Sequence, residues 1–212
     1  MKRLQKPQKL HDAEYWVSRP LDSEKDWFDH RKNWIESYAY STQHPHRQMI
    51  VDAIRNGQPL GSVLEIGCNT GANLLRIQEV FPNMKLVGLD ISEPCTKKAK
   101  EFLPNATIKL GNYLSIPFAD KSFDAVLADA SLMYAKPSEI VKVMQEIDRV
   151  TRWGVIIIDR FDKSKKGVRS GHVWARNYPA LLKDIGFKTT AKKITKQEWP
   201  KSIGWQKYGY LF

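Results

Sequence analysis

The stretch from Val63 to Leu74, VLEIGCNTGANL, constrains the fold of this chain most strongly. Its first residues are mostly apolar, which suits a short strand covered on both faces of a sheet. Gly67 then permits a sharp turn of the backbone, and Gly71 lets a helix begin close beside the strand. Such a turn lies at the carboxyl end of a strand, where open α/β sheets bind ligands. The stretch therefore predicts a strand–turn–helix unit that carries a binding site, with Asn69, Thr70 and Asn73 available to cap the start of the helix.

The glycine spacing separates two kinds of nucleotide site. A dinucleotide-binding turn reads G-x-G-x-x-G, which lets a pyrophosphate approach the helix N-terminus. Here the pattern is Glu65-x-Gly67-x-x-x-Gly71, with an acid two residues before the first glycine. An acid at that place suits a ligand that carries a positive charge. An NAD-binding oxidoreductase is accordingly disfavoured.

A second apolar run, residues 85–89, ends in Asp90. It follows the glycine turn by about 20 residues, which is where nucleotide-binding folds place an acid that binds the ribose hydroxyls. The alternative is that Asp90 or Ser92 caps the next helix.

A third block lies between residues 112 and 124. It contains Asn112 after a short expected strand, an Ile116-Pro117-Phe118 turn, and Ser122-Phe123-Asp124 at the start of a fourth strand. Together with the glycine turn and Asp90, this block resembles the class I S-adenosylmethionine (SAM)-dependent methyltransferases, of the type 11 group that includes the ubiquinone C-methyltransferases. The resemblance covers roughly residues 45–212. Asn69 departs from the family pattern, because a glycine is common at its place.

The resemblance implies a cofactor and a reaction. SAM is the expected methyl donor and S-adenosylhomocysteine the product, with in-line transfer of the methyl group to an O, N or C atom of a small molecule. Asp90 is expected at the ribose, Asp129 beside the methionine part, and Asn112 at the adenine edge, where many relatives carry an acid. The residues that the resemblance places around the cofactor are Glu65, Gly67, Cys68, Asn69, Gly71, Asn73, Asp90, Ile91, Asn112, Tyr113, Asp129 and Ala130.

Strands that alternate with helices predict an α/β fold with a parallel sheet and helices on both faces. The resemblance adds a Rossmann-like, seven-stranded, mostly parallel sheet in the order 3-2-1-4-5-7-6, with an antiparallel last strand. We expect a helix over residues 172–185, the last two strands over 187–193 and 205–212, and no further C-terminal domain. Residues 1–44 are predicted to form an arm and a helical cap, and residues 45–212 the SAM-binding domain. The aromatic face of the cap, with Trp27, Trp34 and Tyr38, either covers the cofactor or packs into a core.

No residue stands out as a general base. His46, His172 and Tyr134 are candidates by position, since histidine accepts protons best near neutral pH. His44, His46 and Arg47 lie together at the start of a helix next to the expected cofactor, although surface or capping roles are the alternative. No cluster of His, Asp or Glu has the spacing of a metal site, so no metal is expected.

The chain of 212 residues has a net charge of +11. A positive net charge can favour binding to nucleic acid, to an anionic membrane or to an acidic substrate, or it can serve solubility alone. We expect a small-molecule substrate. The alternatives are an RNA-directed methyltransferase and a SAM-binding accessory protein. No nucleic-acid-binding motif supports the RNA-directed alternative. A basic segment is expected either to hold an anionic substrate or to form a solvated loop, and it contains Arg160, Lys163, Lys165, Lys166 and Arg169.

No apolar run approaches the roughly 18 residues of a membrane span, and the basic start is not followed by the apolar region of a secretory signal. The two cysteines, Cys68 and Cys95, are not at metal spacing. A cytoplasmic protein in a reducing compartment is expected. The oligomeric state does not follow from the sequence.

Overall fold

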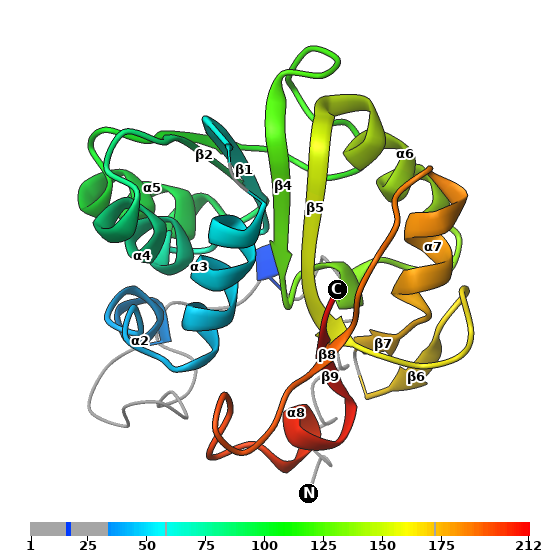
Figure 1. Ribbon diagram of the computed structural model, residues 1–212. Helices are drawn as coiled ribbons and strands as arrows, with labels where there is room; N and C mark the ends of the chain where they lie inside the picture. The colour runs from blue at the N-terminus through cyan, green and yellow to red at the C-terminus, as the bar shows by residue number, and fades with distance from the viewer. Residues whose placement is uncertain (1–15, 18–33, 58, 172) are drawn as a thin grey trace, which may run out of the picture.

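The computed structural model describes residues 16–17, 34–57, 59–171 and 173–212. Its main feature is a seven-stranded sheet in the order β3-β2-β1-β4-β5-β9-β8 (Figure 1). The first five strands are parallel, and β9 runs antiparallel to β5. The predicted order and the reversed last strand are thereby confirmed. The strands are β1 (Ser62–Ile66), β2 (Lys85–Asp90), β3 (Thr107–Leu110), β4 (Phe123–Asp129), β5 (Thr151–Arg160), β8 (Lys192–Lys193) and β9 (Gly209–Leu211).

Helices cover both faces of the sheet (Figure 1). One face packs against α3 (His46–Asn56), α4 (Ala72–Val80) and α5 (Glu93–Phe102), and the other against α6 (Ile140–Val150) and α7 (Tyr178–Asp184). Strand β1 serves both layers, because Val63 belongs to the first core and Leu64 and Ile66 to the second. All five residues of β1 are buried, as expected for a strand covered on both sides.

Three short elements lie near the carboxyl ends of the strands: α2 (Trp34–Ala39), the 3-10 helix η1 (Leu132–Tyr134) and α8 (Ile203–Tyr208). In Figure 1, α2 and α8 lie at the end of the sheet toward which the arrowheads of β4 and β5 point. Most of the predicted arm and cap, including Trp27, lies outside the described residues. None of the described helices combines the length and the apolar character that are needed to cross a bilayer.

The predicted helix over residues 172–185 is too long. A two-stranded sheet of β6 (Val168–Ser170) and β7 (Val173–Ala175) occupies its beginning, and α7 starts only at Tyr178. The start is marked by Asn177, whose Oδ1 accepts a hydrogen bond from the Ala180 N–H at 3.1 Å, and by Pro179 in the first turn. Both are ordinary signals of a helix N-terminus.

The last two strands were also predicted too long. Only Lys192–Lys193 of the first becomes a strand, and residues 203–208 of the second form α8. Ser202 caps this helix by accepting a hydrogen bond from the Trp205 N–H. Strand β9 then begins at Gly209, where a Cβ atom would lie 2.6 Å from the Trp205 carbonyl oxygen. The glycine allows the helix to pass directly into the strand.

Candidate functional site

A cavity of about 540 Å³ lies at the carboxyl ends of the parallel strands. Its walls come from the turn after β1, the ends of β2 and β4, the loop after β3, the start of α3 and the C-terminal segment 199–205. The volume falls within the roughly 300–1,000 Å³ of small-molecule sites. Parallel α/β sheets bind ligands at this edge, where the strand order reverses.

The turn after β1 is shaped by close contacts. Gly67 has φ +73°, and a Cβ atom there would lie 2.5 Å from the Ser131 Cβ. The N–H groups of Gly67 and Cys68 donate to the Leu89 carbonyl at 2.7 and 3.1 Å. The turn is therefore fixed against the end of β2 and approaches the segment after β4 closely.

All of the residues predicted around the cofactor line this cavity except Gly71. Gly71 has φ +81°, and a Cβ atom there would lie 2.5 Å from the Leu103 Cδ1. This glycine lets α4 start in close contact with the end of α5. Its role is in packing, while its neighbours Thr70 and Ala72 form the wall.

The Asp90 carboxylate holds backbone groups as well as facing the cavity. Its Oδ2 accepts from the Asn69 N–H at 2.7 Å and its Oδ1 from the Ser92 N–H at 2.8 Å. Ser92 is the N-cap of α5, but its side chain makes no capping hydrogen bond. Asp90 thus braces the glycine turn and the start of α5, and each oxygen has further lone pairs for a ligand.

A buried polar network forms the floor of the cavity. The Asn73 Nδ2 donates to the Glu65 Oε1 at 2.6 Å and to the Asp129 Oδ2 at 2.9 Å. The His46 Nε2 lies 2.9 Å from the same Asp129 oxygen, and Arg47 donates to the Asn73 Oδ1. Asn73 was expected to cap a helix; instead it bridges two carboxylates. The Glu65 Oε2 and the Asp129 Oδ1 are buried and have no hydrogen-bond partner among the described residues.

Burial and charge set the protonation states of this network. Burial raises the pKa of Glu65 well above its usual range. Burial also acts to raise the pKa of Asp129, but His46 and Arg47 outweigh it and hold that pKa below the usual value. Burial lowers the pKa of His46 although Asp129 opposes the shift. At neutral pH, Asp129 is therefore ionised and His46 neutral.

The candidates for a general base differ in their placement. A neutral His46 donates its Nε2–H to Asp129, and its Nδ1 then accepts from the Nδ1–H of His44. Both ring nitrogens are thus engaged, so His46 organises the site and has no nitrogen free for a substrate. Tyr134 lines the cavity, and His172 lies outside the described residues.

One wall of the cavity is an aromatic column that begins at His46, the hydrogen-bond partner of Asp129. His46 stacks on Trp199 with ring centroids 4.3 Å apart, and Trp199 stacks on Trp205 at 4.3 Å and 8°. The Arg160 guanidinium lies over the Trp205 ring at 5.8 Å from its centroid. Four residues from α3, β5 and the C-terminal segment therefore form one continuous stack beside the cavity.

Comparisons with known proteins agree with this geometry. A family model described as a methyltransferase domain matches residues 63–154. The demethylmenaquinone methyltransferase of Symbiobacterium thermophilum is 29% identical over 116 residues, which are 51% of this chain and 45% of the relative. The 24-methylenesterol C-methyltransferase 2 of Arabidopsis thaliana is 27% identical over 187 residues, covering 76% of this chain and 51% of the relative. The chain spans about a third to two thirds of the length of the curated relatives it matches.

A solved SAM-dependent methyltransferase from Aquifex aeolicus shares the fold, with a TM-score of 0.63, 18% identity and coverage of 84% of this chain and 94% of that one. The family model and the relatives show that the chain is similar to the class I SAM-dependent methyltransferases. The order of the strands in the sheet agrees with that similarity.

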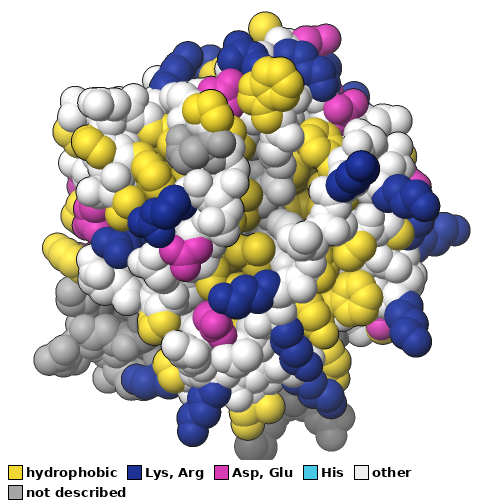
Figure 2. All heavy atoms as spheres, in the orientation of Figure 1, with side chains coloured by type: hydrophobic (Ala, Val, Ile, Leu, Met, Phe, Trp, Pro, Cys, Tyr) yellow, Lys and Arg dark blue, Asp and Glu magenta, His cyan; other side chains and the backbone are white. Residues whose placement is uncertain are grey.

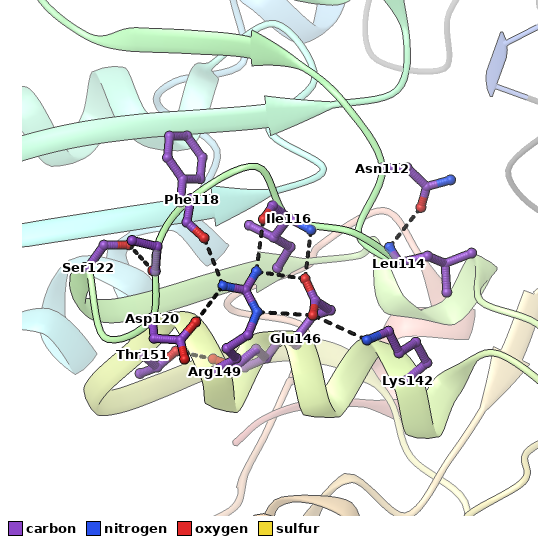
Figure 3. Close-up of polar contacts among 12 residues, drawn as sticks. Asn112, Leu114, Ile116, Phe118, Asp120, Ser122, Lys142, Glu146, Arg149 and Thr151 are labelled. Carbon is purple, nitrogen blue, oxygen red and sulfur yellow. Dashed lines mark hydrogen bonds and ion pairs between the residues drawn. The ribbon is translucent and has the colours of Figure 1, made fainter.

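The loop that carries Asn112 and Tyr113 is anchored to α6 (Figure 3). Glu146 accepts from the Ile116 N–H at 2.8 Å, and Arg149 donates to the carbonyls of Ile116 and Phe118, both at 2.8 Å. Figure 3 shows the Arg149 guanidinium between these carbonyls and the Glu146 carboxylate. The anchor positions the loop at the cavity wall without contributing to the wall itself.

Part of the cavity wall was not expected from the sequence. Trp199, Lys201 and Trp205 line the cavity, although they were expected to lie in loops or in a strand. Of the predicted basic segment, Arg160 alone lines the cavity, and Lys165 pairs with Asp184 at the surface. No local spacing marks these residues, because the cavity brings them together from distant segments.

Proposed function

We propose that this protein transfers a methyl group from SAM to an O, N or C atom of a small molecule. The observation that carries the proposal is the pair of unpaired, buried carboxylate oxygens, Glu65 Oε2 and Asp129 Oδ1, beside the glycine turn. Buried polar atoms without partners are rare and costly. A ligand with an ammonium group supplies donors for both oxygens, and the methionine part of SAM carries one.

The remaining wall fits the other parts of SAM. We assign Asp90 to the ribose hydroxyls and Ile91, Asn112 and Tyr113 to the adenine, because all four residues line the cavity. A pyrophosphate ligand would instead meet three buried acids, Glu65, Asp90 and Asp129. The charge of the site therefore favours SAM over a dinucleotide, as the glycine spacing does.

When bound, SAM supplies an electrophilic methyl group on a sulfonium, and S-adenosylhomocysteine is the product of its displacement. The protein contributes positioning and the exclusion of water. Of the N-terminal segment, Trp16 and Tyr38 are the described residues that line the cavity. A small molecule is the acceptor, because the cavity is partly enclosed by these aromatic side chains.

The positive charge gives less support to a nucleic-acid substrate. Figure 2 shows Lys and Arg side chains spread over one face of the molecule, between apolar and acidic ones, rather than merged into a stripe. Proteins that track a nucleic-acid backbone usually present such a stripe. The cytoplasm is the proposed compartment.

Calorimetry tests the proposal. SAM and S-adenosylhomocysteine should bind and NAD should not. Tight NAD binding with no response to SAM would contradict the proposal.

A further inference from the structure

The cavity is divided by charge. Its carboxylates, Glu65, Asp90 and Asp129, lie at the ends of β1, β2 and β4. Two cations, Arg160 at the end of β5 and Lys201 in the C-terminal segment, lie on the other side. A third cation, Arg47, lines the acidic side, where it lies 3.8 Å from the Asp129 Oδ2. Within the part of the chain that the structure describes, no carboxylate pairs with Arg160 or Lys201. One side is thus suited to a cation and the other to an anion.

Buried atoms without a hydrogen-bond partner among the described residues lie on both sides. On the acidic side they include the acceptors Glu65 Oε2 and Asp129 Oδ1 and the Thr70 hydroxyl, which can donate or accept. On the other side they are donors, the Arg160 Nε and the Trp199 Nε1. Trp199 is only 4% exposed, so its indole N–H has no access to bulk water. A buried donor without a partner is destabilising, and a hydrogen-bond acceptor on a ligand would remove that cost.

The surfaces between the two ends are apolar and largely aromatic. Trp16 contacts Tyr134 edge to face at 5.5 Å and Tyr38 at 6.4 Å. Met133 and Val173 complete this part of the wall. Aromatic edges and faces favour flat, ring-containing ligands. The anchor for an anion therefore lies at the end of a slot that suits a ring.

We infer that the methyl acceptor is a small, ring-containing carboxylic acid whose carboxylate binds to Arg160, to the Trp199 indole N–H and to Lys201. That this ligand accepts the methyl group rests on the proposed function. The carboxylate subsite does not, because it is argued from the side chains that line this part of the cavity. A guanidinium and an indole N–H can both donate to one carboxylate. Held there, the ring reaches toward the acidic end, where the methyl donor lies.

The test is calorimetry on the full chain, with and without saturating S-adenosylhomocysteine. The probes are matched pairs that differ in charge: phenylacetate against phenylacetamide, and indole-3-acetate against indole-3-acetamide, with phenyl phosphate added. The carboxylates should bind about tenfold more tightly than their amides, since charge-assisted hydrogen bonds are roughly twice as strong as neutral ones.

Two variants locate the effect. Arg160→Gln should remove most of the preference for the carboxylate, and Trp199→Phe should reduce it while keeping the stacked ring. Lys165→Gln is the control, because Lys165 lies on the same segment but pairs with the exposed Asp184. Circular dichroism and an unchanged affinity for S-adenosylhomocysteine show that the variants are folded.

The outcomes are distinct. Equal binding of acids and amides by the wild type, or an undiminished preference in Arg160→Gln, would overturn the inference, and so would binding of phenyl phosphate alone. A carboxylate preference without any binding of S-adenosylhomocysteine would support the subsite and contradict the proposed function. Binding of S-adenosylhomocysteine with no preference for carboxylates over amides would contradict the carboxylate subsite and support the proposed function.

Discussion

The Glu146–Arg149 anchor behind the cavity gives a prediction with a magnitude. The hydrogen bond from Arg149 is the main reason that the pKa of Glu146 falls from 4.5 to about 2. That difference corresponds to about 3 kcal/mol of native-state stabilisation. Because the Arg149 side chain is 29% exposed, solvent screens part of it. We expect Glu146→Gln to lower the free energy of unfolding at neutral pH by about 1–3 kcal/mol.

The sign of the pH dependence follows from the lowered pKa. The stabilisation is present above the unfolded-state value of 4.5 and is lost as the pH falls toward about 2. Urea unfolding of wild type and variant at neutral pH and at about pH 3 should therefore show a difference that shrinks in acid. The control is Glu79→Gln, since Glu79 pairs with Arg76 at 2.8 Å on the surface. This substitution should lower the free energy of unfolding by less than about 0.5 kcal/mol. A Glu146→Gln cost that is equal at both pH values would refute the reasoning.

Three other predictions concern the site. Gly71→Ala should lower the free energy of unfolding by about 1–3 kcal/mol, since φ is +81° and a Cβ would lie 2.5 Å from Leu103; denaturant titration measures it, and a neutral result would contradict the packing role. Asp90→Asn should weaken S-adenosylhomocysteine binding by about 1–3 kcal/mol in calorimetry; unchanged affinity in a folded variant would leave Asp90 only as a brace for the turn. Burial raises the pKa of Glu65 in the free protein, so SAM binding should release a proton from its carboxyl group. The affinity for SAM should therefore increase with pH. Calorimetry in two buffers of different ionisation enthalpy detects that proton; equal heats would count against the role of Glu65, and Glu65→Gln should abolish the release.

The strand order and much of the cavity were predictable from the sequence because they rest on local patterns. A glycine turn after an apolar strand and an acid at the end of the next strand fix two neighbouring strand ends. The third block contributes to both the cavity and the frame, because Asn112 lines the cavity while Asp124 lies at the opposite ends of the strands. Asp124 accepts from the Gly61 N–H at 2.8 Å and binds Arg152 at 2.9 Å, so it joins the starts of β1, β4 and β5.

The C-terminal third was predicted less well, because its structure depends on distant contacts. Residues 205–212 have the aromatic content of a strand, but Trp205 lies in a helix where it can stack on Trp199. The column of His46, Trp199, Trp205 and Arg160 joins segments that no spacing rule relates. Pairing of Lys165 with Asp184 likewise could not be read from the charge pattern.

A crystal structure with S-adenosylhomocysteine would test the central claim most directly. We predict the ligand in the cavity at the carboxyl ends of β1, β2 and β4, with its ammonium group at the Glu65 Oε2 and the Asp129 Oδ1, its ribose at Asp90 and its adenine beside Asn112. Binding at another place, or in this cavity with the ammonium group away from both carboxylates, would contradict the account.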